Sequence, residues 1–258
     1  MHNNSIIEDT FAYLGVITEV QSVDALWQAH VEFMGQFGFD RIVYGFTRYM
    51  SETSLGDPLD WTVLAHGTDA YLQQMIAEGH LLNGPMIRWA LENNGACSWS
   101  VLADSDALTA REQEVLAFNH AAGITAGYTI SFRSLSSRSK GAIGLIGKPG
   151  LSQDDVDGIW AAHGAQIVVA NNVMHLKLQS LPVSGQRQLT LRQKQVLQWV
   201  SDGKTTQDIA DLIGVAPVTV EKHLRLAREA LDVQTTAQAV LKAATYNQIF
   251  TSDGPDLR

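Results

Sequence analysis

Two short helical patterns follow one another in residues 203–231, which read GKTTQDIADLIGVAPVTVEKHLRLAREAL. The first helix begins at a threonine cap, Thr205 or Thr206, and ends at Gly214, a residue type that readily adopts the left-handed turn beyond a helix. Pro217 suits the first turn of the second helix. Two helices joined by a short glycine-containing turn form the helix-turn-helix layout, in which the second helix enters the major groove of DNA.

The predicted second helix has two unlike faces. At about 100° per residue, Val220 shares one face with Leu224, Ala227 and Leu231, and we expect this face to be buried. The opposite face is charged and polar, which is also typical of an ordinary solvated helix. The preceding helix and turn favour DNA contact, because Lys and Arg reach guanine or phosphate and Glu accepts from cytosine. The predicted DNA-binding residues are Lys204, Thr205, Val218, Thr219, Glu221, Lys222 and Arg225.

A third helical pattern precedes this pair and completes the C-terminal part. Thr190, with Gln193 three residues later, has the spacing of a capping box. We predict an all-α helix-turn-helix domain of four helices over residues 188–258. A polar stretch with proline, glycine and serine comes before it and predicts a linker over residues 179–187.

The net charge of −9 argues against a nucleic-acid partner only if the charge is evenly spread. Residues 185–258 hold nine basic and eight acidic side chains, whereas the residues before them hold nine basic and nineteen acidic ones. The acidity therefore belongs to the first part of the chain, and charge does not exclude DNA as a partner of the second.

Residues 1–178 mix strand and helix patterns. Four β-branched or aromatic runs bounded by turn residues predict strands over residues 42–46, 61–65, 128–132 and 142–146. Helical spacing begins near Val23, Asp69, Pro85, Thr109 and Ser152. Paired strands with helices before, between and after them predict an α/β/α sandwich around an antiparallel sheet. The predicted class of the whole chain is therefore α+β.

Several functional classes lack their signatures. No apolar run reaches the ~18–20 residues of a transmembrane helix, and the first residues lack the pattern of a signal peptide. The single cysteine, Cys97, excludes an internal disulfide and a cysteine-rich metal cluster and makes the cytoplasm the expected location. Without a phosphate-binding loop, a nucleophile elbow or a zinc motif, we predict no enzyme activity, catalytic residue, metal or cofactor.

Six short motifs in residues 188–245 resemble, in order and spacing, the GerE/NarL-type domain that ends LuxR-type regulators. They are Leu189-Thr190-x-Arg192, Val196-Leu197, Gly203-Lys204-Thr205, Ile209-Ala210, Thr219-Val220 and His223-Leu224. Ala216 replaces the family's Ser or Thr and is a weaker helix cap by about 1 kcal/mol. A homodimer on double-stranded DNA with a two-fold operator is expected, because one helix-turn-helix reads few bases.

The first part resembles the LuxR-type autoinducer-binding domain. Trp99 and the segment Ala121-Ala122-Gly123-x-x-x-Gly127 carry this resemblance. It implies an α/β/α sandwich that holds an acyl-homoserine lactone. A phosphoacceptor receiver is excluded, since it would begin with a strand that ends in paired acidic residues.

Ligand-contacting positions of that family differ in this chain. The aspartate that accepts the ligand's amide N–H falls on Gly84, and the tryptophan that donates to the lactone carbonyl falls on Tyr71. A nearby tyrosine falls on Met75, and a small hydroxyl position falls on Gly144. Gly67, with Gly84 and Gly144, is expected to enlarge the site. The predicted ligand-binding residues are Tyr44, Tyr71, Met75, Asn83, Gly84, Met86, Trp99, Val115, Ile124, Thr129 and Gly144.

Two functions stay open from the sequence. The resemblance implies a LuxR-type quorum-sensing regulator that senses a small apolar signal, an acyl-homoserine lactone or an atypical relative. The alternative is a ligand-independent regulator whose N-terminal domain only dimerises or binds a protein partner, because aromatic and Met residues at helical spacing also build ordinary cores.

Overall fold

The computed structural model describes residues 2–51, 54–103, 108–134, 136–182 and 187–250. The chain divides into two compact units, Met1–Leu178 and Gln179–Arg258. None of the helices within the described residues is long and apolar enough to cross a membrane.

The first unit is built on a five-stranded antiparallel sheet with the strand order β2-β1-β5-β4-β3. The strands are β1 (Phe39–Thr47), β2 (Thr62–His66), β3 (Gly95–Ser98), β4 (Gly127–Phe132) and β5 (Lys140–Gly147). Four of them correspond to the predicted strands. The sequence did not indicate β3, because its residues Gly-Ala-Cys-Ser are small and weak strand formers.

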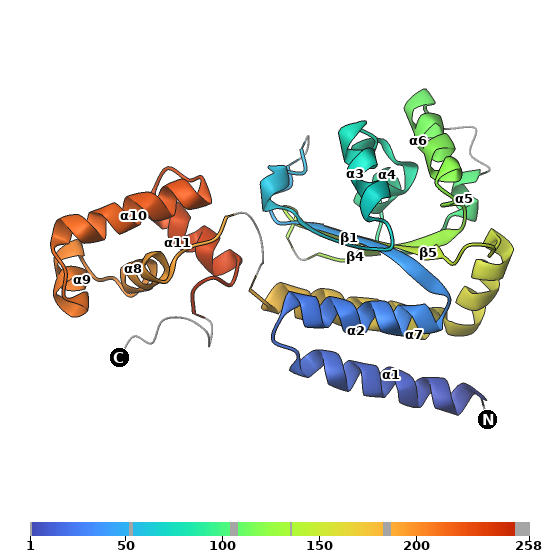
Figure 1. Cartoon of the computed structure of the whole chain (residues 1–258), viewed down its shortest axis with the longest axis horizontal. Coiled ribbons are helices and arrows are strands. Elements are labelled where there is room, and N and C mark those ends of the chain that lie inside the picture. The colour runs from blue at the N-terminus through green and yellow to red at the C-terminus, as the bar shows by residue number, and fades with distance from the viewer. Residues whose placement is uncertain (1, 52–53, 104–107, 135, 183–186, 251–258) are drawn as a thin grey trace. The chain divides into compact units, whose positions relative to one another are not determined.

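Helices cover both faces of this sheet, which confirms the predicted α/β/α sandwich (Figure 1). One face packs on α2 (Val23–Gln36) and α7 (Gln153–Ser180), and α1 (His2–Glu19) lies outside α2. Stacking of Tyr128 on Trp160, with ring centroids 3.8 Å apart, joins β4 to α7. No pattern in the sequence predicted α1.

A polar cluster is buried between α1, α2 and α7. His30 on α2 lies 2.6 Å from the Tyr13 hydroxyl and 3.1 Å from Asn171 Oδ1, and none of the three is exposed. Asn171 also donates to the Ile167 carbonyl at 2.8 Å. Because a buried polar group is costly without a partner, these bonds hold the three helices in one arrangement.

The opposite face of the sheet carries shorter helices. They are α3 (Asp69–Ala77), α4 (Pro85–Glu92), α5 (Ser100–Ala103) and α6 (Ala110–Ala121), with single 3-10 turns at Pro58–Asp60 and Leu81–Asn83. Thr109 and Glu112 form a capping box at the start of α6, as their spacing predicts. Glu112 also accepts from Arg88 at 2.7 Å, which ties α6 to α4.

The described part of the second unit is the predicted all-helical domain, with four helices: α8 (Leu191–Ser201), α9 (Thr206–Ile213), α10 (Pro217–Leu231) and α11 (Thr236–Thr245). Thr190 and Gln193 form the expected capping box. Between the two candidate caps of α9, Thr205 is the one used, and its hydroxyl accepts from the Asp208 N–H. The buried side chains of α10 are the four expected from the helical wheel, Val220, Leu224, Ala227 and Leu231.

The two units divide at Gln179, the first residue of the predicted linker, while helix α7 runs slightly beyond that point. Helix α7 continues through Gln179 and Ser180, the first two residues of the range 179–187. The helix ends before Pro182, because a residue that precedes proline is disfavoured in helical geometry. Residues 183–186 lie outside the described residues.

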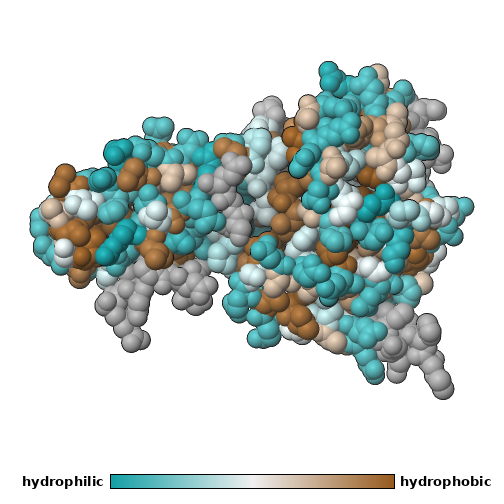
Figure 2. Space-filling view, in the orientation of Figure 1, coloured by the Kyte–Doolittle hydropathy of each residue, from teal (hydrophilic) through white to brown (hydrophobic). Residues whose placement is uncertain are grey.

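Hydrophobic residues on the face shown in Figure 2 lie in small groups separated by hydrophilic ones. Isolated exposed apolar side chains are normal on a protein surface and need no partner to explain them. The first unit has its large apolar surface in its interior, where it lines a cavity.

Candidate functional site

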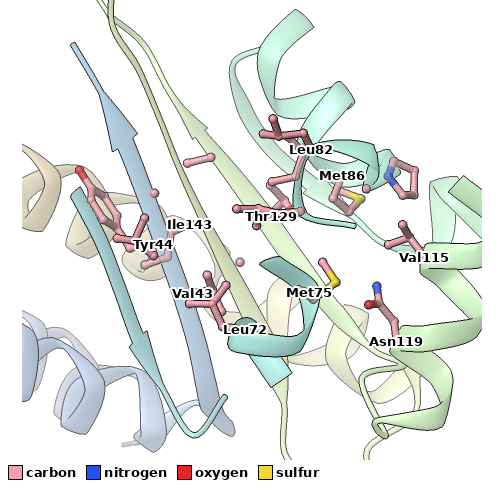
Figure 3. Close-up of a pocket in the computed structure, with 18 of the residues that line it drawn as sticks. Val43, Tyr44, Leu72, Met75, Leu82, Met86, Val115, Asn119, Thr129 and Ile143 are labelled. Carbon is pink, nitrogen blue, oxygen red and sulfur yellow. The ribbon is translucent and has the colours of Figure 1, made fainter. Parts of the chain in front are cut away.

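A cavity of about 400 Å³ lies between the sheet and the helices α3, α4 and α6 (Figure 3). Side chains from α3, α4 and α6, including Leu72, Met75, Met86 and Val115, form its helical wall. Its volume is in the range of small-molecule pockets, which are concave, mostly apolar and hold a few placed polar groups.

Small residues on the sheet leave the space open. Gly45, Ala142 and Gly144 line the cavity from β1 and β5. A Cβ atom added at Gly144 would meet only the Val43 carbonyl oxygen, at 3.9 Å. The absence of a side chain there therefore provides volume, as expected from the sequence.

Two hydrogen-bonded pairs place polar groups in the wall. Tyr71 on α3 donates its hydroxyl to Asn119 Oδ1 on α6 at 2.7 Å. Trp99 donates its indole N–H to the Thr129 hydroxyl on β4 at 2.9 Å. Burial raises the pKa of Tyr71 to about 12, so its phenol stays protonated and a donor.

The described residues that line the cavity include no carboxylate. Lys140 lines it from the start of β5, and its ammonium donates to the Asn93 carbonyl at 2.8 Å and to Asn94 Oδ1 at 3.3 Å. Burial lowers the pKa of Lys140. The described lining thus has an apolar body, a few hydrogen-bonding side chains that include the imidazole of His120, and one lysine that is already engaged by two oxygens.

Gly84 stands at the N-cap of α4 in an extended conformation with φ −72°. A Cβ atom there would lie 3.5 Å from Ile87 and 3.8 Å from Val115, which are ordinary contacts. A larger residue is therefore sterically allowed at position 84. The family resemblance implies an aspartate there, but this chain has a glycine.

The structure brings most of the sequence-predicted ligand residues together. Tyr71, Met75, Gly84, Met86, Trp99, Val115, Ile124, Thr129 and Gly144 all line the cavity. Asn83 is not among the lining residues, and its amide donates to the Gly79 carbonyl at 2.6 Å. Gly67 is not among them either; it turns the chain after β2 with φ +67°, where a Cβ atom would lie 2.9 Å from the Asp40 carbonyl oxygen.

Tyr44 lines the cavity in a different way from the one expected. Its phenol lies 2.8 Å from His175 Nδ1 on α7, on the far face of the sheet. Figure 3 shows its ring turned away from Met75 and Asn119. Because alternate residues of a strand face opposite sides, the neighbouring Val43 faces the cavity instead.

Sequence reasoning missed several lining residues that helical spacing could have found. Asn119 is four residues after Val115 on α6, and Leu72 is three before Met75 on α3, so each pair shares a helix face. Trp61 and Val63, two residues apart around the start of β2, show the spacing of one strand face.

A second candidate site is the helix-turn-helix formed by α9 and α10. Gly214 adopts the left-handed conformation with φ 67° at the end of α9, and Pro217 begins α10. The two helices pack through buried side chains, Ile209 on α9 and Val220 and Leu224 on α10. The opposite side of α10 is exposed to solvent. Val218 on this side is 74% exposed.

The predicted DNA-contact residues fall into two groups in the structure. Lys204, Val218, Lys222 and Arg225 are exposed, and Thr219 is half-buried. Thr205 caps α9 while Glu221 accepts from the Thr206 hydroxyl at 2.7 Å, so both already have a structural partner. Arg225 pairs with Glu229 at 2.5 Å on the exposed helix face, an ion pair that phosphate or a base can replace at small cost.

Comparison with known proteins gives matches along both units. Residues 22–178 match the autoinducer binding domain, and residues 187–243 match the bacterial regulatory proteins of the luxR family. The transcriptional activator AnoR of Acinetobacter nosocomialis is 23% identical over 236 residues, which are 89% of this chain and 94% of AnoR. The quorum sensing-dependent regulator RpaR of Rhodopseudomonas palustris is 33% identical over 132 residues, 49% of this chain and 50% of RpaR. The crystal structure of Escherichia coli SdiA has the same fold, with a TM-score of 0.51 and 16% identity over 95% of this chain and 99% of SdiA.

Proposed function

Because the chain belongs to the LuxR family of transcriptional regulators with an autoinducer-binding domain, we propose that its cavity holds a small apolar signal and that it reads a two-fold operator as a homodimer. It is a DNA-binding regulator of the quorum-sensing type and not an enzyme. We propose a cytoplasmic location, because the proposed target is DNA.

The observation that carries the ligand proposal is the cavity of about 400 Å³ inside the first unit. A cavity of this size is costly to leave empty, since protein interiors are close-packed and lost contacts destabilise the fold. A ligand that binds only the folded state would recover part of this cost.

The lining residues argue against an ordinary acyl-homoserine lactone as the best ligand. The amide N–H of such a molecule needs an acceptor, and Gly84 supplies no side chain. Loss of a hydrogen bond to a charged acceptor costs about 1.5–3 kcal/mol, which lowers affinity about tenfold to a hundredfold. We therefore propose a non-standard signal.

Calorimetric titration with octanoyl-homoserine lactone tests this claim of altered specificity. We expect binding weaker than micromolar. A micromolar or tighter dissociation constant would contradict the proposal.

Mass spectrometry of the protein purified from its native host tests whether a ligand is used at all. An extracted small molecule that also raises the melting temperature of ligand-free protein supports the sensor. Recovery of protein without a small molecule, in cells where its target gene is regulated, would favour the regulator that only dimerises or binds a protein partner.

The exposed face of α10 supports the proposed DNA contact. Lys222 and Arg225 lie on that face, opposite the buried Val220. We propose that they contact bases or phosphates, with Lys204, Thr205, Val218, Thr219 and Glu221 around them.

Substitution of either cation tests the placement. Lys222→Ala and Arg225→Ala should each weaken operator binding by about 1–3 kcal/mol in an electrophoretic shift assay. Lys194→Ala on α8, which removes one positive charge elsewhere in the unit, is the matched control. Unchanged operator affinity in both α10 variants would refute the placement.

A further inference from the structure

We propose that the natural occupant of the cavity is a neutral molecule whose polar group only accepts hydrogen bonds, such as a ketone or an ester on an apolar body. The proposal rests on the proposed ligand-sensing function and names the chemical class that this site selects. Within the described residues, the wall of the cavity has hydrogen-bond donors that no protein acceptor uses.

The amide of Asn119 is oriented by a partner from another helix. Its Oδ1 accepts from the Tyr71 hydroxyl at 2.7 Å, which assigns Nδ2 to the other end of the side chain. Figure 3 shows this side chain directed from α6 toward the space between Met75 and Val115. With Oδ1 occupied by the Tyr71 hydroxyl, the two N–H hydrogens of Nδ2 are offered to the cavity.

Thr129 presents a second donor from the sheet. Its oxygen accepts from the Trp99 indole N–H at 2.9 Å, and indole can only donate. The hydroxyl hydrogen of Thr129 is thus not used in that bond. Thr129 pairs with Gly144 across β4 and β5, so the neighbouring strand position has no side chain to cover this hydroxyl.

Acceptors for a ligand N–H are scarce by comparison. The described lining residues hold no carboxylate and one imidazole, that of His120, and the oxygens of Asn119 and Thr129 each already accept one bond. A buried ligand amide would therefore leave its N–H poorly satisfied, whereas a carbonyl oxygen would meet the two donors.

A carboxylate ligand fits less well than a neutral carbonyl. Among the described lining residues, Lys140 is the one lysine and it already donates to two oxygens, and the only other basic side chain is the imidazole of His120. Moving an anion into such a space carries a large desolvation cost without a free partner.

The test uses three probes with the same alkyl chain: methyl octanoate, N-methyloctanamide and octanoate. Their dissociation constants are measured on the full chain by calorimetry, at neutral pH. We expect the ester to bind at least about fivefold more tightly than the amide, the fold-change that an unsatisfied N–H produces, and octanoate to bind most weakly.

The ester and the amide also differ in how strongly water solvates them, which by itself affects their affinities. The variant Asn119→Asp separates that effect from recognition by the Asn119 amide. The carboxylate can still accept from Tyr71 with one oxygen, and its second oxygen replaces a donor by an acceptor. The ratio of ester to amide affinity should shift toward the amide by about tenfold. Asn172→Asp, the same change at an exposed position on α7, is the matched control and should leave the ratio unchanged.

An infrared measurement on the wild-type protein covers the case in which Asn119→Asp does not fold. The carbonyl stretch of isotope-labelled methyl octanoate should fall below its frequency in hexane when the donors bind it. Three results would each overturn the inference while leaving the ligand-sensing function intact. They are a carbonyl frequency like that in hexane, an unshifted affinity ratio in a folded Asn119→Asp protein, and tightest binding of octanoate among the three probes. Failure of all three probes to bind would overturn the proposed sensing of a small apolar signal and the inference with it.

Discussion

Acid is expected to destabilise the first unit through His30. Burial lowers the pKa of His30 to about 4, against about 6.5 in an unfolded chain. Asn171 Nδ2 donates to the Ile167 carbonyl, so Asn171 Oδ1 accepts, His30 Nε2 carries the hydrogen and Nδ1 accepts from Tyr13. Protonation of Nδ1 removes the acceptor of the Tyr13 hydroxyl and puts an unpaired charge in the core.

The sign and size of the effect follow from proton linkage. Between pH 6.5 and pH 4 the unfolded chain binds a proton at this histidine and the folded chain does not. The contribution of His30 to the free energy of unfolding is therefore complete above pH 6.5 and is lost as the pH falls. One pKa unit corresponds to about 1.4 kcal/mol, so the loss is about 2 kcal/mol between pH 7 and pH 5 and about 3 kcal/mol at pH 4.

Urea unfolding of the full chain at pH 7 and pH 5, compared between the wild type and His30→Gln, measures this contribution. Glutamine can donate to Asn171 and accept from Tyr13 without titrating. Burial also lowers the pKa of His175 to about 4, and that residue is unchanged in both proteins. His66→Gln, a change at an exposed histidine, is the control. A loss of stability between pH 7 and pH 5 that is equal in wild type and His30→Gln would refute the reasoning.

Three further substitutions, the last with a control, probe the cavity and the helix-turn-helix. Gly84→Asp should raise the affinity for octanoyl-homoserine lactone about tenfold or more in calorimetry, because it adds a charged acceptor at a position where a Cβ atom fits. Gly144→Leu should fold, since a Cβ atom there meets no close neighbour, but it should fill the cavity and abolish the thermal stabilisation given by a bound ligand. Ile209→Ala, at a fully buried position of α9, should cost about 2–5 kcal/mol in urea unfolding of the second unit, whereas Leu212→Ala, at an exposed position of the same helix, should change the unfolding free energy by less than about 0.5 kcal/mol.

Local signals were sufficient to predict the helices of the C-terminal unit. These signals are the caps at Thr190 and Thr205, the turn at Gly214 and the start of α10 at Pro217. Each of them involves only residues within about one helical turn of the signal itself. A capping box or a left-handed glycine acts on the backbone next to it, so it can be recognised without knowledge of the fold. The buried face of α10 followed from helical periodicity for the same reason.

The cavity required the tertiary structure. The sequence indicated most of its lining residues, but not that the Tyr44 ring faces α7 while Val43 faces the cavity, because a shift of one residue in strand register exchanges the two faces. The orientation of the Asn119 amide is set by Tyr71, 48 residues earlier in the chain. The identities of the side chains come from the sequence, whereas the direction in which their donors point is decided by contacts between distant segments, which no local pattern records.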